Sequence, residues 1–194
     1  MTNQQTLLKD VHLWQHGKTY VFMLSGKAGV GKTFSANILK ELLSKEFNFI
    51  DIKNFARSVK YIATTSFGWN GKKDKAGRKL LQDIGRTGRE YNKDIWAEII
   101  VDEVSMGFPL DALIIDDWRY PNEYQVLADN DTMDVTTIRI NAPNREILTG
   151  TQAQDVSEVS LDDFKFDYVI DNSGDDKTLM ENLEKIVNQT LTKS

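Results

Sequence analysis

Eight consecutive residues combine glycines, a lysine and a threonine at a spacing suited to phosphate binding. They are Gly26, Lys27, Ala28, Gly29, Val30, Gly31, Lys32 and Thr33, which read G-x-x-x-x-G-K-T, the pattern of the phosphate-binding P-loop. Glycines permit a tight turn whose backbone N–H groups point into one concavity, where an anion can sit. In this pattern the lysine reaches the β- and γ-phosphates, and the hydroxyl after it is a Mg²⁺ ligand. The motif therefore predicts that Lys32 contacts nucleotide phosphates and that Thr33 holds a metal ion.

The segments on either side of this loop have the periodicity that a P-loop requires. Residues 20–24 form an apolar run typical of a strand, and from Thr33 onward apolar residues recur at helical spacing, at Phe34, Ile38, Leu39, Leu42 and Leu43. A glycine-rich turn with an incidental lysine is the alternative interpretation. The order of strand, glycine loop and helix favours the P-loop.

A carboxylate at the end of a second apolar run is the next candidate. Asp116 directly follows residues 112–115, and such an unbroken apolar run is typical of a strand buried on both faces of a parallel sheet. Beside a P-loop, a carboxylate in this position usually holds Mg²⁺ directly or through water. An ordinary strand-end carboxylate is the alternative, and the presence of the P-loop favours the metal role. Arg119 would either face the phosphates across the same edge of the sheet or pair with Asp117.

Basic, amide and aromatic side chains in two further segments suggest a second substrate. The candidates are Phe55 and Lys60 in residues 55–60, and Arg78, Gln82, Arg86 and Arg89 in residues 78–89. Arg78 and Gln82 are four residues apart and share a face of a predicted helix. A guanidinium binds phosphate in a bidentate manner, and a glutamine amide both donates to and accepts from a base edge. These groups suit a nucleoside monophosphate, although a solvated helix face with routine charges would look similar.

The elements between these motifs predict the fold class. Strands are expected at residues 20–24, 47–52, 112–115, 135–140 and 166–170, with helices between them, a basic loop at 68–77 and an irregular segment at 141–160. Strands that alternate with helices imply a parallel sheet between two helical layers. At 194 residues, the chain is expected to form one α/β domain, a three-layer sandwich with a parallel five-stranded sheet.

Composition and charge exclude several classes of function. A net charge of −5 argues against a non-specific nucleic-acid binder, whose surface would be basic. The absence of cysteine excludes disulfides, thiolate metal sites and thiol nucleophiles. The sequence has no 18-residue apolar run and no secretory leader, so we expect no membrane contact and a cytoplasmic location.

Beyond its N-terminal residues, nearly the whole chain resembles the bacteriophage-type deoxynucleoside monophosphate kinases, a branch of the P-loop nucleotide kinases. The resemblance is carried by the P-loop and by residues 116–123, which read D-D-W-R-Y-P-N-E, with further matches at 55–60, 80–89, 94–96, 157–158 and 167–172. It implies a P-loop NTPase fold of the nucleotide kinase type with an N-terminal extension (1–18), an acceptor-binding helical lobe (about 53–108) and a lid (about 141–160). It also implies transfer of the γ-phosphoryl group of ATP to a deoxynucleoside monophosphate (dNMP), in the host cytoplasm if the protein is viral.

The resemblance assigns roles to individual residues. ATP would lie on Gly26–Thr33 with Lys32 bridging to the transferred group, Mg²⁺ near Thr33 and Asp116, and Asn172 bordering the adenine. The acceptor would be surrounded by Lys60, Arg78, Gln82, Arg89 and Trp96, with Arg119 between the two nucleotides and Arg145 as the lid arginine. Arg86 stands where relatives often have a small residue, which would narrow or redirect acceptor choice. The lid departs from the Asp-His-x-Ser-Glu stretch of relatives, because only Ser157 and Glu158 are kept.

No general base is required for the implied reaction. The acceptor nucleophile is a phosphate oxygen, which is already ionised at neutral pH because its second pKa is about 6. Three alternatives remain: a P-loop kinase for a phosphorylated metabolite that is not a nucleotide, a nucleotide-dependent NTPase or switch, and a degenerate P-loop protein that binds nucleotide without chemistry. The intact Lys32, Thr33 and Asp116 count against the last of these. For either kind of kinase the expected partner is a small-molecule substrate. A homodimer is compatible with the sequence.

Overall fold

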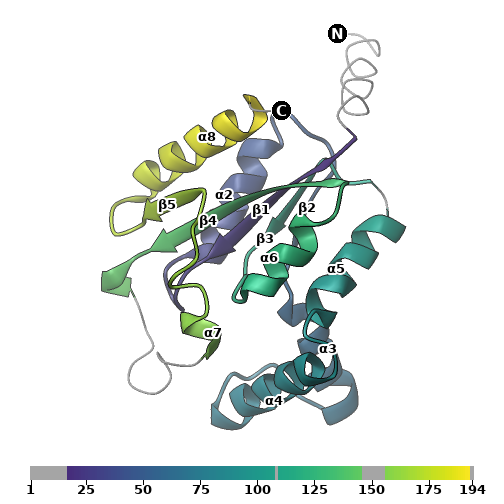
Figure 1. Cartoon of the computed structure of the whole chain (residues 1–194). Coiled ribbons are helices and arrows are strands. Elements are labelled where there is room, and N and C mark those ends of the chain that lie inside the picture. Colours follow the sequence, from purple (N-terminus) through teal and green to yellow (C-terminus); the bar gives the residue numbers. More distant parts are fainter. Residues whose placement is uncertain (1–16, 108, 146–155, 193–194) are drawn as a thin grey trace.

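The computed structural model describes residues 17–107, 109–145 and 156–192. Its centre is a five-stranded sheet in the order β2-β3-β1-β4-β5, in which every neighbouring pair is parallel (Figure 1). Helices cover both faces of the sheet, so the predicted three-layer α/β sandwich is confirmed.

The strands fall close to the apolar runs that predict them. Their bounds are β1 Thr19–Ser25, β2 Ile50–Lys53, β3 Ala112–Ile115, β4 Met133–Asn141 and β5 Tyr168–Asp171. The largest difference is in β2, which begins three residues later than predicted. The backbone N–H groups of Asn48 and Phe49 donate to the side chain of Asp111, at 3.0 and 2.8 Å, and this contact precedes the strand ladder.

The helices differ from the prediction at two places. Their bounds are α2 Lys32–Leu43, α3 Ala56–Phe67, α4 Lys75–Tyr91, α5 Ile95–Met106, α6 Pro121–Ala128, α7 Val156–Val159 and α8 Asp176–Thr192, with a 3₁₀ turn, η1, at Pro143–Arg145. The basic loop is shorter than expected because Asp74 caps α4 by accepting the Gly77 N–H at 2.8 Å. The short helix α7 lies within the segment predicted to be irregular.

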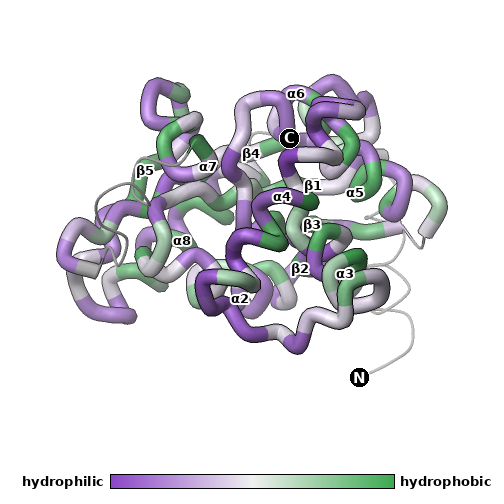
Figure 2. Tube along the Cα trace, turned by 90° about the horizontal axis from the view of Figure 1, so that it is seen from below, coloured by the Kyte–Doolittle hydropathy of each residue, from purple (hydrophilic) through white to green (hydrophobic). Residues whose placement is uncertain are grey.

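Alternating side chains of β1 divide the core into two parts. Phe22 and Leu24 pack on one face of the sheet with α2 and α8, whereas Val21 and Met23 pack on the other face with α3, α5 and α6. Hydrophobic residues gather along the central strands, and hydrophilic residues follow the outer turns (Figure 2). In the described part of the chain, no helix has the length and apolar character needed to cross a membrane.

The carboxyl ends of the parallel strands meet at one edge of the sheet, which is where open α/β sheets bind ligands. The P-loop follows β1 at this edge, and Asp116 follows β3 beside it. Helices α3 and α4 pack on each other and extend below the edge as a helical lobe (Figure 1).

Candidate active site

The P-loop has a backbone that only glycine can adopt at several positions. Gly26, Gly29 and Gly31 have φ values of 153°, 89° and 98°, in the region that side chains disfavour. A Cβ atom at Gly26 would lie 2.4 Å from the carbonyl oxygen of Ile140, and one at Gly31 would lie 2.7 Å from Nδ2 of Asn172. The loop is therefore packed tightly against the ends of β4 and β5.

Lys32 is folded back onto the loop that presents it. Its Nζ donates to the carbonyl oxygens of Gly26 at 2.7 Å and Lys27 at 2.9 Å. Burial, and secondarily the positive charge of Arg119, lowers the pKa of Lys32 to about 8. The amine is therefore held among groups that do not fully stabilise its charge, and an anion in the loop would supply the missing stabilisation.

The side chains predicted to hold the metal lie in contact. Thr33 Oγ1 at the start of α2 donates to Asp116 Oδ2 at the end of β3, at 2.8 Å. This pair fits Mg²⁺, a hard cation that binds through one or two carboxylates and completes its shell with water and substrate phosphates. No group of three or more His, Cys, Asp or Glu side chains that could cage a metal occurs within residues 17–107, 109–145 and 156–192. The donor set thus suits an ion shared with substrate.

Asn172, directly after β5, is hydrogen-bonded to the backbone of the P-loop. Its side chain is only 2% exposed, and Nδ2 donates to the carbonyl oxygen of Val30 at 2.9 Å. Its Oδ1 is buried without a hydrogen-bond partner in the described chain. The amide thus fixes the loop conformation, and contact between Asn172 and an adenine stays a prediction.

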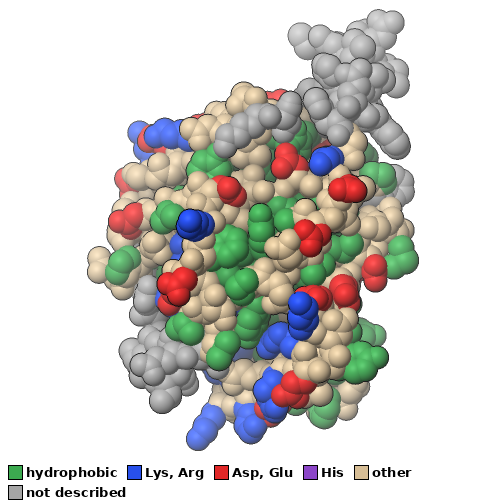
Figure 3. All heavy atoms as spheres, viewed as in Figure 1, with side chains coloured by type: hydrophobic (Ala, Val, Ile, Leu, Met, Phe, Trp, Pro, Cys, Tyr) green, Lys and Arg blue, Asp and Glu red, His purple; other side chains and the backbone are tan. Residues whose placement is uncertain are grey.

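A cavity of about 650 Å³ lies between the helical lobe and the carboxyl edge of the sheet. It gathers most side chains that the sequence assigns to a second substrate: Phe55, Lys60, Arg78, Gln82, Arg89, Trp96 and Arg119. Lys73 and Lys75 add further positive charge to its wall, whereas Lys79 pairs with Asp83, which also lines it. With Asp117 and Glu158 as the other acidic members, the cationic side chains of the lining outnumber the acidic ones. Lys and Arg side chains gather on the surface around the same lobe, at the lower end of the molecule (Figure 3). The cavity is therefore suited to an anionic ligand.

Trp96 sets the distance between the two helices that form one wall of this cavity. Its Nε1 donates to the carbonyl oxygen of Gly85 in α4 at 3.1 Å, and the side chain is buried. A Cβ atom at Gly88 would lie 2.3 Å from the Trp96 ring, so the indole of α5 packs directly on the α4 backbone.

Two arginines of α4 lie in different surroundings. The Arg89 guanidinium lies over the Tyr120 ring, 4.4 Å from its centroid, and lines the cavity. Arg86 does not line the cavity; its guanidinium pairs with Asp83 at 3.3 Å and Glu90 at 2.9 Å on the exposed face of the helix. The structure thus brings Arg89 to the candidate acceptor site and leaves Arg86 outside it.

The run that follows β3 holds the site together through residues whose roles the sequence did not reveal. Asp117 accepts the backbone N–H groups of Phe55 at 2.8 Å and Ala56 at 3.0 Å, which joins the start of α3 to the end of β3. Desolvation raises the pKa of the Asp117 carboxyl, and the two N–H groups oppose this shift by stabilising its charge. Asn122 donates to the Lys93 carbonyl oxygen at 2.8 Å and thereby anchors the turn before α5.

Glu123 shapes the turn that presents Arg119. One carboxylate oxygen accepts the backbone N–H groups of Arg119 at 2.9 Å and Tyr120 at 3.0 Å. The side chain is 4% exposed, and burial raises the pKa of Glu123 to about 8. The spacing of Asp117, Arg119, Asn122 and Glu123 is therefore explained by the contacts that fix the helical lobe and the turn.

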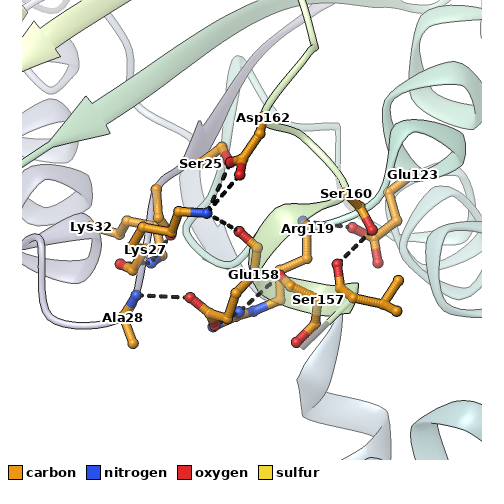
Figure 4. A network of polar contacts seen from close by, with 12 residues as sticks. Ser25, Lys27, Ala28, Lys32, Arg119, Glu123, Ser157, Glu158, Ser160 and Asp162 are labelled. Carbon is orange, nitrogen blue, oxygen red and sulfur yellow. Dashed lines mark hydrogen bonds and ion pairs between the residues drawn. The ribbon is translucent and has the colours of Figure 1, made fainter. Parts of the chain in front are cut away.

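Arg119 does not pair with Asp117, the alternative that the sequence left open. Its Nη1 donates to a carboxylate oxygen of Glu158 in α7 and to the Ser157 carbonyl oxygen, the latter at 3.1 Å (Figure 4). Glu158 Oε2 also accepts the P-loop N–H of Ala28 at 3.0 Å. Sequence reasoning missed Glu158 as a site residue, and the only available signal was that Ser157-Glu158 is the retained part of the lid pattern. The side chain of the predicted lid arginine, Arg145, lies outside the described residues, although its backbone ends η1.

Comparisons with known proteins agree on the fold. No protein-family model and no curated protein matches this chain. Among solved structures, that of APE1195 aligns with a TM-score of 0.51 at 15% identity, covering 91% of this chain and 97% of that one. The Mycobacterium tuberculosis APS kinase CysC in complex with AMPPNP and APS aligns with a TM-score of 0.50 at 13% identity, covering 91% and 99%. These similarities show that the chain shares the three-layer α/β fold of these two proteins, one of which is an APS kinase.

Proposed function

We propose that this protein transfers the γ-phosphoryl group of ATP to a deoxynucleoside monophosphate and releases the diphosphate. The observation that carries the proposal is the cavity beside the P-loop, whose lining combines cationic side chains with an amide and an indole. Arg119 belongs to this lining and is joined through Glu158 to the P-loop residue Ala28. An enzyme of this kind would act on cytoplasmic nucleotides, in the host cell if the protein comes from a bacteriophage.

The cavity has the size and the groups that a nucleotide acceptor requires. Its volume of about 650 Å³ falls within the range of small-molecule sites. We assign Arg78 and Lys60 to the acceptor phosphate, because both are cationic and line the cavity. Gln82 would bind the edge of the base, since an amide can donate and accept at once, and Trp96 would offer it an apolar wall.

The donor would lie on the P-loop. Its backbone N–H groups and Lys32 would bind the phosphates of ATP, and Thr33 and Asp116 would hold Mg²⁺. When bound there, the ion would neutralise charge on the β- and γ-phosphate oxygens. Arg119 would then lie between donor and acceptor, where a guanidinium stabilises the charge of the transferring group.

This arrangement addresses the main difficulty of the reaction, which is the repulsion between two polyanions. The acceptor oxygen is ionised at neutral pH, so the transfer needs alignment and positive charge more than a base. Lys32 and Arg119 would supply that charge at the point of transfer, and closure of the helical lobe would exclude water that would otherwise hydrolyse ATP.

A coupled assay of ADP formation with ATP, Mg²⁺ and each of the four dNMPs tests the proposal. We expect turnover with at least one dNMP and little ATP hydrolysis without an acceptor. Lys32→Ala should abolish turnover, whereas Lys40→Ala, an exposed lysine of the same helix, should not. Absence of turnover with every dNMP would refute the assignment of the acceptor.

A kinase for a phosphorylated metabolite is the second candidate. Lys73 and Lys75 at the cavity wall favour it, because they would suit an acceptor with more than one anionic group. A kinase of APS also has this fold, so the fold does not restrict the acceptor to a dNMP. The same assay with phosphorylated sugars and acids separates the two, and Gln82→Ala would leave turnover of a metabolite unchanged if no base is recognised.

A further inference from the structure

The Glu158 carboxylate bridges the P-loop and Arg119. Oε2 accepts the Ala28 N–H at 3.0 Å, and Oε1 pairs with Nη1 of Arg119 (Figure 4). The Glu158 side chain is only 5% exposed, so these contacts are shielded from solvent. A backbone N–H of a P-loop and an arginine between two nucleotide sites are both groups that bind phosphate oxygens. In this structure a carboxylate of the same chain occupies them.

The helix that carries Glu158 is fastened to the P-loop a second time. Lys27 Nζ donates to the Glu158 carbonyl oxygen at 2.6 Å and to both carboxylate oxygens of Asp162 at 2.9 Å. Asp162 also pairs with Arg139 of β4 at 3.0 Å. Lys27 is thus linked to α7 through a backbone carbonyl, and to Arg139 through the carboxylate of Asp162, which follows the helix.

The charges around this point favour an anion in it. Lys27, Lys32, Arg119 and Arg139 bring four cationic side chains to the carboxyl edge of the sheet. Asp162 pairs with Lys27 and Arg139, and Glu158 pairs with Arg119, so the cations still outnumber these two anions. A second anion that arrives at the Ala28 N–H and at Arg119 would meet the Glu158 carboxylate at short range, and like charges in a poorly solvated site repel strongly. The two anions therefore compete for the same donors.

We infer that the Glu158 carboxylate is an internal substitute for a nucleotide phosphate, which holds the P-loop and Arg119 in place and is displaced when ATP binds. This inference rests on the proposed function to the extent that the displacing phosphate is that of ATP. Displacement would remove the carboxylate from Arg119, whose remaining contact with α7 is the hydrogen bond to the Ser157 carbonyl oxygen, and would let the guanidinium contact the transferring group. Glu158 thus positions Arg119 in the free enzyme and opposes nucleotide binding until a phosphate replaces it.

Calorimetric titration of the full chain with Mg²⁺ and AMPPNP tests the inference. Glu158→Gln keeps one oxygen, which can accept from Ala28 or from Arg119 but not from both as the carboxylate does, and it removes the charge. Because both changes weaken the internal competitor, we expect the variant to bind AMPPNP at least about fivefold more tightly than wild type. Glu46→Gln, the same change at an exposed residue beyond the far end of α2, should bind as wild type does. Equal or weaker binding by Glu158→Gln would overturn the inference and leave the proposed function standing.

The same experiment separates failure of the function from failure of the inference. Tighter binding by Glu158→Gln without turnover of any dNMP would support the displacement and reject the proposed acceptor. If neither wild type nor Glu158→Gln binds AMPPNP, both the ATP site and the displacement are wrong.

A second measurement needs no substitution and holds even if Glu158→Gln does not fold. A crystal structure of the wild-type protein with Mg²⁺ and AMPPNP should show the Glu158 carboxylate beyond hydrogen-bond distance of the Ala28 nitrogen. A structure that keeps this hydrogen bond with the γ-phosphate in place would overturn the inference.

Discussion

The carboxylate of Asp117 accepts the backbone N–H of Phe55 at 2.8 Å, across 62 residues of sequence. Its other oxygen accepts the N–H of Ala56 at 3.0 Å, so one side chain at the end of β3 satisfies two donors at the start of α3. The helical lobe is thereby held to the strand that also presents Asp116. The position of the candidate acceptor site relative to the candidate metal site depends on this link.

Replacing Asp117 by asparagine should weaken both the fold and acceptor binding. The amide has one accepting oxygen, so its NH₂ group would face one of the two N–H donors and leave it unsatisfied. We expect Asp117→Asn to lower the free energy of unfolding by about 1–3 kcal/mol and to raise KM for the acceptor more than it lowers kcat. Urea unfolding and steady-state kinetics check this, with Asp163→Asn at an exposed position as the control. An unchanged KM would show that the link does not position the acceptor site.

Asp116→Ala should raise the Mg²⁺ concentration that the reaction requires. Thr33 would lose its carboxylate partner, and the ion would retain only the hydroxyl, water and the nucleotide phosphates. We expect the Mg²⁺ concentration for half-maximal activity to rise about tenfold or more, since a lost ligand contact is worth 1.4 kcal/mol or above. Titration of activity with Mg²⁺ measures this concentration. Added chelator should abolish the activity of the wild type. A variant with an unchanged Mg²⁺ requirement would exclude Asp116 from the metal site.

Activity should fall at alkaline pH because of Lys32. The pKa of this amine is lowered to about 8 in the free protein, chiefly by burial, so its positive charge is present below that pH and is lost above it. We expect kcat/KM for ATP to decline about tenfold per pH unit above the pKa, because kcat/KM reports groups of the free enzyme. The measurement is a pH profile at saturating acceptor. A profile that stays flat across this pKa would mean that the charge of Lys32 is retained.

Gln82 and Arg86 should differ in their effect on acceptor choice. Gln82 lines the cavity, so Gln82→Ala should change the relative kcat/KM values of the four dNMPs by about threefold to tenfold, the worth of one hydrogen bond. Arg86 pairs with Asp83 and Glu90 outside the cavity, and we expect Arg86→Ala to change these ratios by less than about twofold. The reverse result would restore Arg86 to the role that the sequence suggests.

Stability should fall as pH rises because of Glu123. Burial raises the pKa of this carboxyl from 4.5 to about 8 in the folded protein. Between these two values the folded state retains a proton that the unfolded state releases. The free energy of unfolding therefore keeps the full contribution of this protonated carboxyl below pH 4.5 and loses it as the pH rises to about 8. The loss is at most about 1.4 kcal/mol per pH unit.

Glu123→Gln provides the comparison for that prediction. The neutral amide keeps an oxygen for the N–H groups of Arg119 and Tyr120 and cannot titrate. Urea unfolding at several pH values should therefore show a smaller decline for Glu123→Gln than for wild type, and Glu41→Gln on the exposed face of α2 should follow wild type. Parallel curves for Glu123→Gln and wild type would contradict the raised pKa.

The sequence predicts those parts of the site that depend on local pattern and on sheet topology. The P-loop and Asp116 are read from residues next to apolar strands, and parallel strands bring their carboxyl ends to one edge, so Thr33 and Asp116 meet as expected. The start of β2 was missed because a side chain, Asp111, accepts the N–H groups that an extended backbone would otherwise pair. Such competition between side chain and backbone leaves no periodic signal.

Contacts between distant segments were harder to foresee. Arg119 had a nearby carboxylate in Asp117, yet it pairs with Glu158, because Asp117 is already engaged by two backbone donors. Arg86 and Arg89 are three residues apart on α4, yet only Arg89 lines the cavity, where it lies over Tyr120, whereas Arg86 pairs with Asp83 and Glu90. Residues at this spacing are neighbours on a helix, so their partners separate them and the sequence spacing does not.

The bare backbone of Gly88 under the Trp96 ring has a practical consequence for engineering this protein. Any side chain at that position would clash with Trp96, since even a single methyl group would overlap the indole. Either the Trp96 indole or helix α4, which also carries Gln82, would have to shift. Gly88→Ala thus offers a way to reshape the cavity through Trp96 and α4 while every side chain that lines it keeps its chemical identity.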